Sequence, residues 1–404
     1  MADFLIISGL LLIFYAYFGY PFVLLILTWL NPVGKKAKVI RQLDSNVHEN
    51  CEKPQTASIL IAARNEVKAI QKKLENTLTL SFGSGTVESE RVQIVVASDA
   101  SDDGMDEIVA SFAARGVQLV KLSERGGKDR ALRAAAEVAT GEILLCTDAQ
   151  VSLNQDALSN TIEYFRDPTV GCVSSVDRIE DSVEAGSQLN DGPKKASGGE
   201  GLYLKYEMWL RQLESEFGTL VGLSGSCFAI RKELATEIRH EVPSDFAILL
   251  AARRRGLRGV QAKDVVGTYG GVASEKAEFE RKVRTVLRGM TTLFSTPEVL
   301  NFKSYGSFAW QVASHKVARW LVPLFLAMVT LGGLTGTSIL AWFAMLGTFL
   351  LPVAALAAVV SPSYREKFFY RAALFFLVVN AAIAVAWVRY LSGVRQTTWT
   401  PTAR

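Results

Sequence analysis

Residues 141–150 read GEILLCTDAQ, a short apolar run that ends in a carboxylate. The apolar residues follow one another without helical spacing, which predicts a strand buried on both faces of a sheet. Asp148 would then stand at the carboxyl end of that strand. Ligands of open α/β sheets bind outside this edge, so Asp148 is placed to hold a metal or a phosphorylated ligand. A simple turn is the alternative, because Asp commonly follows strands.

The region before this stretch alternates between strand and helix patterns. Apolar strands are predicted at residues 57–62, 92–97 and 117–122, with helices between them. The first strand runs into ARNE and the second into SDASDDG, so polar loops again follow the carboxyl ends. This alternation predicts an α/β fold with a mostly parallel sheet and helices on both faces. No GxGxxG follows the first strand, which argues against a dinucleotide-binding dehydrogenase.

Two features of the second half have both a functional and a simpler interpretation. Asp245 stands at the head of an apolar helix, where helix capping is the simpler role. Arg281, Arg284 and Arg288 are spaced three and four apart, so they line one face of a predicted helix. Such a row can bind a diphosphate, although a solvated basic face is the more common interpretation. A Gly/Ser-rich stretch at residues 181–201 predicts a mobile loop.

Long uncharged runs predict a membrane protein. Residues 4–30 contain no charged side chain and are long enough to cross a bilayer. Lys35, Lys36, Lys38 and Arg41 follow at once, which places the N-terminus outside and residue 35 onward in the cytosol. Further spans are predicted at residues 320–334, 338–360 and 372–388, preceded by an interfacial helix at residues 301–319.

The composition excludes several classes of protein. The net charge is only +4 over 404 residues, which argues against nucleic acid as a partner. The four cysteines show no CxxC pairing, so neither a zinc site nor a disulfide framework is predicted. A reducing compartment fits this usage.

Seven motifs resemble, in order and rough spacing, those of membrane-bound family 2 glycosyltransferases. They are AARNE, SDASDDG, GGK before an Ala-rich helix, GEILLCTDAQ, SGSCFAIRKEL, SDF and RKVRTVLRG. The resemblance covers residues 57 to about 290. It implies a cytosolic GT-A domain, whose Rossmann-like sheet binds a nucleotide sugar, related to the catalytic domains of cellulose, hyaluronan and poly-N-acetylglucosamine synthases.

The resemblance suggests an organisation for the whole chain. We expect an N-terminal transmembrane helix at 1–34, a linker at 35–56 and the GT-A domain at 57–300. An interfacial helix at 301–319, three transmembrane helices within 320–391 and a tail at 392–404 would follow. The protein would then lie in the cytoplasmic membrane with its catalytic domain in the cytosol.

The same resemblance implies a donor-binding pocket. Asp99 matches the Asp that reads the nucleotide base. Ala63, Arg64 and Glu66 match residues that wall the same pocket. Lys128 resembles the basic residue near the donor diphosphate.

It also implies where the transfer takes place. Asp148 matches the first Asp of the DxD motif, which binds the diphosphate and its divalent metal, Mg²⁺ or Mn²⁺. Asp245 matches the general base that takes the proton of the acceptor hydroxyl in an inverting transfer. Arg281, Arg284 and Arg288 cover the region of the QxxRW motif and would bind the donor.

Three departures from the family pattern limit what is implied. Gln150 replaces the second acidic residue of DxD and weakens the prediction of a metal, because an amide is a neutral ligand. Ser244 replaces the acidic residue that usually precedes the base. Arg281 and Thr285 replace the Gln and Trp of QxxRW, and loss of the Trp argues against chain polymerisation.

The expected function is therefore a membrane-bound glycosyltransferase of the hexosyltransferase type. It would transfer a sugar from a nucleoside diphosphate donor, expected to be a UDP-sugar, to a lipid-linked or cell-surface glycan acceptor. Its partners would be the donor, the acceptor and membrane lipid. A processive synthase of an extracellular polysaccharide is one alternative. An inactive nucleotide-binding regulator or transporter is another, and Gln150 and Ser244 would favour it.

Overall fold

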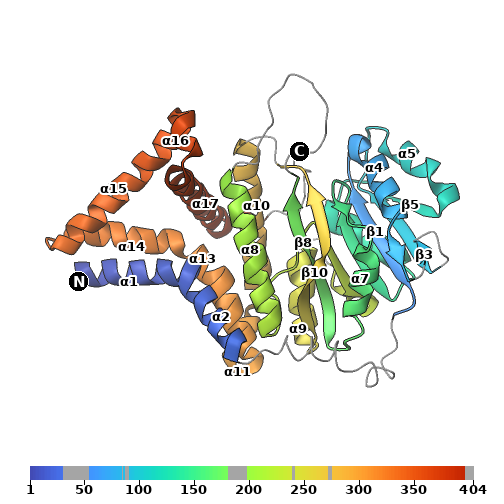
Figure 1. The fold of residues 1–404 in the computed structure, drawn as a ribbon, viewed down its shortest axis with the longest axis horizontal. Coiled ribbons are helices and arrows are strands. Elements are labelled where there is room, and N and C mark those ends of the chain that lie inside the picture. The colour runs from blue at the N-terminus through green and yellow to red at the C-terminus, as the bar shows by residue number, and fades with distance from the viewer. Residues whose placement is uncertain are drawn as a thin grey trace. The chain divides into compact units, whose positions relative to one another are not determined.

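The computed structural model describes residues 1–30, 54–83, 85–86, 91–180, 198–238, 242–271 and 275–395. The chain divides into two compact units, a sheet unit and a helical unit (Figure 1). Of the described residues, the sheet unit contains those within 54–180 and 207–271, and the helical unit contains 1–30, 198–206 and 275–395. Lys35, Lys36, Lys38 and Arg41, most of the predicted loop (181–197) and the end of the tail (396–404) lie outside the described residues.

In the part of the chain that the structure describes, the sheet unit is built on eight strands in the order β5-β4-β1-β6-β9-β8-β10-β7. Their bounds are β1 Ala57–Ala63, β4 Val92–Ser98, β5 Val117–Lys121, β6 Ile143–Asp148, β7 Ser152–Leu153, β8 Val170–Ile179, β9 Cys227–Arg231 and β10 Arg258–Tyr269. A separate hairpin joins β2, Ser81–Phe82, to β3, Gly85–Thr86.

One half of the sheet is parallel, as the sequence predicts. β1 pairs in parallel with β4 and with β6, and β4 pairs in parallel with β5. The register sets Ala63 beside Ser98 and Ala62 beside Asp148, so these three strands end at one edge. The sheet as a whole is mixed, because β9 runs antiparallel to both β6 and β8. β9 therefore starts where β6 ends, which brings the loop before β9 to the edge that carries Asp148.

Gly141 fixes the approach of β6 to β1. A Cβ atom at this position would lie 2.3 Å from the Ala57 carbonyl carbon and 2.4 Å from the Ser58 nitrogen. Any side chain would therefore clash with backbone, so the strand can enter the sheet here only through glycine.

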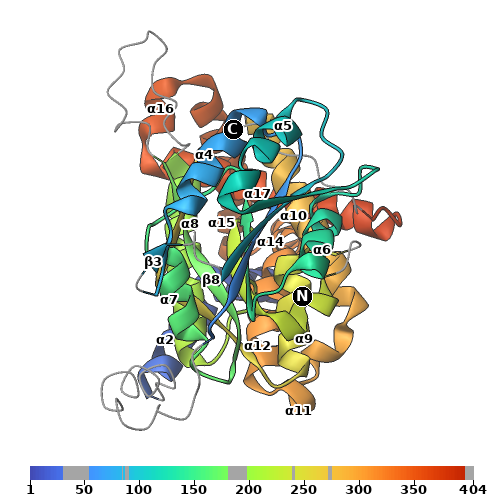
Figure 2. The same cartoon turned by 90° about the vertical axis from the view of Figure 1, so that its right-hand side faces the viewer.

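The sheet has an apolar core on each face because alternate residues of a strand point to opposite sides. Ile59 and Ile61 of β1 belong to the first core, and Leu60 and Ala62 belong to the second. The first core is covered by α4 (Val67–Leu78), α5 (Met105–Ser111) and α7 (Ala157–Tyr164). The second is covered by α6 (Lys128–Val138) and α9 (Ser244–Arg254). Figure 2 shows α4 and α7 on one side of the sheet and α6 and α9 on the other.

The helical unit is all helix in its described part. Its elements are α1 Ala2–Phe14, η1 Tyr15–Gly19, α2 Tyr20–Leu30, α10 Glu275–Ser295, η5 Pro297–Leu300, α11 Phe302–Tyr305, α12 Ser307–Val312, η6 Ala313–Val317, α13 Ala318–Trp320, α14 Val322–Thr335, α15 Ile339–Val360, α16 Pro362–Glu366 and α17 Phe368–Leu391. α8, Gly198–Phe217, begins in this unit and ends in the sheet unit.

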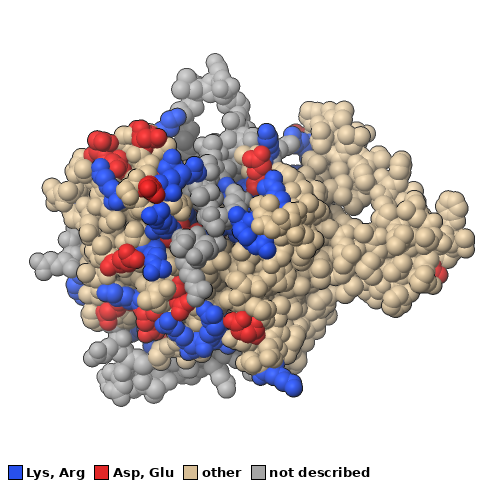
Figure 3. All heavy atoms as spheres, turned by 180° about the vertical axis from the view of Figure 1, so that it is seen from behind, with Lys and Arg blue, Asp and Glu red and all other residues tan. Residues whose placement is uncertain are grey.

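Within the described residues, three helices of this unit are long and apolar enough to cross a membrane. They are Ala2–Leu30, Ile339–Val360 and Phe368–Leu391. Ser307–Trp320 and Val322–Thr335 pass the same test together but are bent by 55° at the break, so a fourth span is counted if the pair is taken as one. The face of this unit seen in Figure 3 carries few Lys, Arg, Asp or Glu side chains, which suits contact with lipid.

Candidate active site

Two loops at the carboxyl edge are tied together by backbone groups. Arg64 follows β1, and its Nη1 donates hydrogen bonds to the carbonyl oxygens of Asp99 (2.7 Å) and Ala100 (2.9 Å). The amide of Asp99 in turn donates to the carbonyl of Ala63 at 2.9 Å. Arg64, Ala63 and Asp99, all predicted to form the nucleotide pocket, are therefore brought together.

The carboxylate of Asp99 holds the loop before α6. Its Oδ1 accepts a hydrogen bond from the Gly126 amide at 2.6 Å, and its Oδ2 accepts one from the Gly127 amide at 2.9 Å. Asp99 is only 1% exposed. Gly127 has φ +88°, a conformation that favours glycine over any other residue. Asp99 thus fixes the backbone directly before α6, the helix that begins with Lys128.

Lys128 joins three parts of the edge. Its Nζ forms an ion pair with Asp148 at the end of β6 and donates a hydrogen bond of 2.7 Å to the Gly225 carbonyl. Burial lowers the pKa of Lys128, but the carboxylates of Asp148, Asp129 and Asp245 together outweigh this and the net pKa is raised. The ammonium group therefore stays protonated and offers a positive charge beside Asp148.

Asp148 itself is held through its backbone. Its amide donates to the Ser226 carbonyl at 3.0 Å, which links the end of β6 to the loop before β9. Its side chain is 22% exposed, so a ligand can reach the carboxylate.

A buried lysine lies behind this turn. Lys73 of α4 is 2% exposed, and its Nζ donates to Thr147 Oγ1 at 3.0 Å and to the Val151 carbonyl at 2.8 Å. Burial lowers the pKa of Lys73 to about 8, although the nearby Asp148 carboxylate acts in the opposite direction. Lys73 therefore braces both ends of the turn that carries Asp148.

Gln150 turns its amide to Glu66. The Nε2 group donates to both carboxylate oxygens of Glu66, at 2.8 and 2.9 Å. Glu66 is buried and precedes α4. The pair ties the loop after β1 to the turn after β6, so Gln150 makes a structural contact at the second position of the DxD-like motif.

Asp245 lies in the first turn of α9, beside the same loop. A Cβ atom on Gly225 would be only 3.1 Å from Asp245 Oδ2, so the carboxylate packs against the glycine whose carbonyl accepts from Lys128. The preceding residue, Ser244, donates through its amide (2.9 Å) and its Oγ (2.5 Å) to Asp129 Oδ1. Asp129 directly follows Lys128 in α6.

A second carboxylate holds the loop around Gly225. Asp177 lies near the end of β8, and its Oδ1 accepts hydrogen bonds from Ser224 Oγ at 2.7 Å and Ser226 Oγ at 2.6 Å. Both flanking residues of Gly225 are thereby fixed.

The three arginines form a separate group on α10, which belongs to the helical unit. Arg281 pairs with Glu278 through two hydrogen bonds of 2.7 Å. Burial and the neighbouring guanidinium groups of Arg288 and Arg281 lower the pKa of Arg284. This mutual repulsion means that the row would gain stability by binding an anion.

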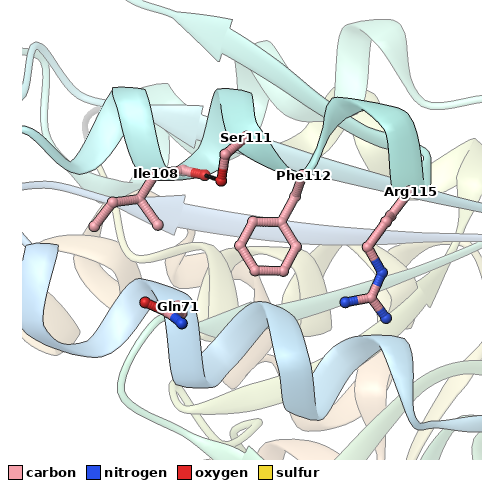
Figure 4. Close-up of a pocket in the computed structure, with 5 residues that line it drawn as sticks. All are labelled: Gln71, Ile108, Ser111, Phe112 and Arg115. Carbon is pink, nitrogen blue, oxygen red and sulfur yellow. Dashed lines mark hydrogen bonds between the residues drawn. The ribbon is translucent and has the colours of Figure 1, made fainter.

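A pocket on another part of the sheet unit does not involve these residues. It has a volume of about 380 Å³ and lies between α4 and α5 (Figure 4). Its lining is Gln71, Ile108, Ser111, Phe112 and Arg115. This lining contains no carboxylate, so it does not suit a general base or a metal.

The residues around Asp148 can hold a divalent metal only with help from a ligand. Among the residues that the structure describes, no cluster of three or more His, Cys, Asp and Glu side chains could bind one. Mg²⁺ is nevertheless commonly held by one or two carboxylates together with substrate phosphates. Asp148 fits that arrangement as the single protein carboxylate, because Gln150 is engaged by Glu66.

Sequence reasoning found the ends of the strands but missed three supporting residues. Asp177 carries the same signal as Asp148, an acidic residue at the end of an apolar strand. Asp129 could be suspected because it follows Lys128 in the first turn of a predicted helix. Lys73 gives no signal, because a lysine in an amphipathic helix is normally exposed.

Part of the chain is similar to known glycosyltransferases. Residues 58–239 match the family described as Glycosyl transferase family 2. The poly-beta-1,6-N-acetyl-D-glucosamine synthase of Staphylococcus aureus (strain COL) is 30% identical over 132 residues, which are 32% of this chain and 30% of that protein. The corresponding synthase of Staphylococcus epidermidis is 30% identical over 124 residues, or 30% of this chain and 28% of that protein. The match thus spans less than a third of either relative.

A solved structure resembles nearly the whole chain. The mannosyltransferase PcManGT from Pyrobaculum calidifontis, in complex with GDP-Man and Mn²⁺, superposes with a TM-score of 0.65 at 22% sequence identity. The likeness covers 96% of this chain and 99% of that one. It confirms the GT-A fold predicted from the sequence motifs.

Proposed function

We propose that the chain, whose residues 58–239 match Glycosyl transferase family 2, transfers a sugar from a nucleoside diphosphate donor to a lipid-linked or glycan acceptor. The observation that carries this proposal is the meeting of three charged groups around Gly225. Lys128 donates to its carbonyl, Asp148 pairs with Lys128, and the Asp245 carboxylate packs against its Cα. A cation for a diphosphate and a carboxylate for a proton thus lie on two sides of one glycine.

The chemistry of an inverting transfer assigns a task to each group. Asp245 would accept the proton of the acceptor hydroxyl as that oxygen attacks the anomeric carbon. The bond from the anomeric carbon to the diphosphate oxygen breaks, and Lys128 would neutralise the charge that develops there. Gly225 leaves room for both because it has no side chain.

Asp148 would hold a divalent cation, Mg²⁺ or Mn²⁺, together with phosphate oxygens of the donor. Such a cation supplies positive charge to the departing diphosphate when it is bound. The Mn²⁺ and GDP-Man in the complex of PcManGT support this class of donor and metal for a chain of the same fold. A UDP-sugar remains our expected donor, with GDP-sugars as the first comparison.

Asp99, with Ala63, Arg64 and Glu66, would line the pocket of the nucleotide base. Asp99 already accepts two backbone hydrogen bonds, so its role toward the base would include fixing the pocket wall. Arg281, Arg284 and Arg288 would add positive charge for the diphosphate. The catalytic domain would face the cytosol from the cytoplasmic membrane, consistent with the apolar helices and with a lipid-linked acceptor.

The test is transfer by the full chain purified in detergent and returned to lipid vesicles. Radiolabelled UDP- and GDP-sugars are supplied with a lipid extract as acceptor, and incorporation into lipid or glycan is measured. Replacing Asp245 with Asn should reduce transfer by about 10²- to 10⁴-fold, because a general base contributes that much. Donor affinity should change little. Asp156→Asn, an exposed carboxylate that precedes α7, is the matched control and should stay active.

Two outcomes would contradict the proposal. One is the absence of transfer and of nucleotide binding with every donor. The other is an Asp245→Asn variant that keeps turnover within a few-fold of the parent, which would exclude Asp245 as the base.

A processive polysaccharide synthase is the second candidate. The similarity to poly-beta-1,6-N-acetyl-D-glucosamine synthases favours it, whereas Thr285 in place of the Trp of QxxRW disfavours it. Product length distinguishes the two: a ladder of polymer in the assay supports the synthase, and addition of one sugar supports simple transfer.

A further inference from the structure

We propose that Asp129 is a positioning residue that orients the general base Asp245 through Ser244. This inference rests on the proposed function, since it assigns a role within the same reaction. It starts from one carboxylate oxygen, Asp129 Oδ1, which accepts both the amide and the hydroxyl of Ser244, at 2.9 and 2.5 Å. Two donors from one residue fix both its backbone and its side chain.

The contact is shielded from water. Asp129 is 5% exposed and Ser244 is 3% exposed, so a charge-assisted hydrogen bond there is stronger than one at the surface. Loss of the carboxylate would leave the Ser244 donors without this partner in a buried place, which is costly.

The position of Ser244 makes the contact relevant to the base. Ser244 is the first residue of α9, and Asp245 is the second. On its other side, the carbonyl of Asp245 accepts a hydrogen bond of 3.3 Å from the Leu223 amide. The first turn of α9 is therefore held from two directions, and the Asp245 carboxylate is left against Gly225.

Asp129 also connects the base to the donor side. Its neighbour Lys128 reaches Asp148 and the Gly225 carbonyl, whereas Asp129 reaches Ser244. Two consecutive residues of α6 thus set the diphosphate-binding cation and the base at a fixed separation. The sequence departs from the family pattern at 244, where Ser replaces an acidic residue, and Asp129 supplies a carboxylate to the same contact from the opposite side.

Exchanging the two side chains of this contact, Asp129 and Ser244, tests the proposal. Asp129→Ser removes the carboxylate, Ser244→Asp adds a second one, and the double variant exchanges the two side chains. In the double variant the hydroxyl introduced at position 129 can donate to the carboxylate introduced at position 244, which lies in the first turn of α9 and is favoured by the helix dipole. Transfer is measured with the full chain in lipid vesicles, and kcat and the KM for the donor are determined separately.

We expect Asp129→Ser to lower kcat by about 10- to 100-fold, as a small misplacement of a catalytic group does, with donor KM changed less than about three-fold. Ser244→Asp should also lose activity, because two carboxylates would then face each other. The double variant should recover at least about ten-fold over either single variant. Asp106→Asn is the matched control, since Asp106 also lies in the first turn of a helix and pairs with Lys121 at 3.1 Å.

The outcomes separate this role from a merely structural one. If Asp129→Ser keeps the kcat of the Asp106→Asn control, Asp129 does not position the base. If Asp129→Ser loses kcat and donor binding together and the exchange restores neither, Asp129 serves only the fold and the proposal is overturned. An inactive parent protein would contradict the proposed function and this role with it, whereas an active parent with an active Asp129→Ser variant contradicts this role alone.

Discussion

The donor side and the base side of the site are each held by a buried carboxylate, but the hydrogen-bond donors differ. On the donor side, backbone amides of Gly126 and Gly127 fix Asp99. On the base side, the Asp129 side chain fixes Ser244 over a separation of 115 residues. Both contacts depend on one carboxylate as the acceptor, but the base-side contact also depends on the Ser244 hydroxyl, so it needs the side chains of two residues. The difference teaches that the base side should respond more sharply to point substitutions that leave the fold intact.

Lys128 contacts residues of both sides, so its removal should have the largest effect on the site. Lys128→Met would remove the cation beside Asp148 and the hydrogen bond to Gly225. Charge-assisted contacts of this kind are worth about 2 to 3 kcal/mol, which predicts a roughly 30- to 150-fold loss of donor affinity. Binding of a labelled nucleotide sugar, measured by filtration or calorimetry, gives the dissociation constant.

Lys121→Met is the control for this prediction. The Lys121 side chain is 60% exposed and pairs with Asp106 at the surface, a contact worth at most about 1 kcal/mol. Donor affinity should therefore stay at the parent value. A Lys128→Met protein that binds the donor within about three-fold of the parent would show that Lys128 does not contact the diphosphate.

Lys73 supports the donor side from behind, because its buried ammonium group braces the turn that carries Asp148. Its pKa in the folded protein is about 8, against an ordinary value of 10.5, because burial disfavours its charge. Between these two values the unfolded chain binds the proton more strongly, so the free energy of unfolding should rise with pH. The rise should approach about 3 kcal/mol and should be absent in Lys73→Met, which retains the length of the side chain without the charge.

Chemical unfolding of the purified protein at several pH values from 7.5 to about 10.5 measures this difference. Lys72→Met is the matched control, because Lys72 is the exposed neighbour in the same helix and its loss should leave the pH dependence unchanged. Equal slopes for the parent and Lys73→Met would mean that Lys73 is not buried in its charged form at neutral pH.

The parts of the molecule that sequence could predict are those governed by local pattern. The buried strand Ile143–Asp148 and its terminal Asp148 follow from the apolar run within residues 141–150. The parallel half of the sheet follows from the alternation of strands and helices. The seven ordered motifs then indicated the GT-A fold, which the likeness to PcManGT confirms.

What sequence could not predict depends on pairs brought together by the tertiary fold. β9 starts beside the end of β6 and runs antiparallel to it. The sequence pattern of a short buried strand does not indicate in which direction the strand runs through the sheet. The partner of Gln150 could not be anticipated either. A neutral residue at an acidic position suggested only a loss, whereas the structure shows a bidentate contact with Glu66.

Gln150→Asp should have the smallest effect, and it addresses whether one Asp suffices for the metal. The substitution restores the second carboxylate of the motif but removes two hydrogen bonds to Glu66 and sets two carboxylates against each other. We expect stability to fall by about 1 to 2 kcal/mol, whereas transfer at saturating Mn²⁺ should stay within a few-fold of the parent. The Gln71→Asp variant, which alters an exposed Gln71–Glu75 pair, controls for the substitution itself.

Removal of the metal completes this test. EDTA should abolish transfer by the parent and by Gln150→Asp, and added Mn²⁺ should restore both at half-saturating concentrations within about three-fold of each other, because Asp148 and the donor phosphates supply the charged ligands in each. A Gln150→Asp protein that gains ten-fold or more in transfer, or needs ten-fold less Mn²⁺, would show that the parent site lacks a ligand. In that case the contact of Gln150 with Glu66 would stabilise the turn but lower the affinity of the site for the metal. The donor side, rather than the base side, would then limit the activity of the parent protein.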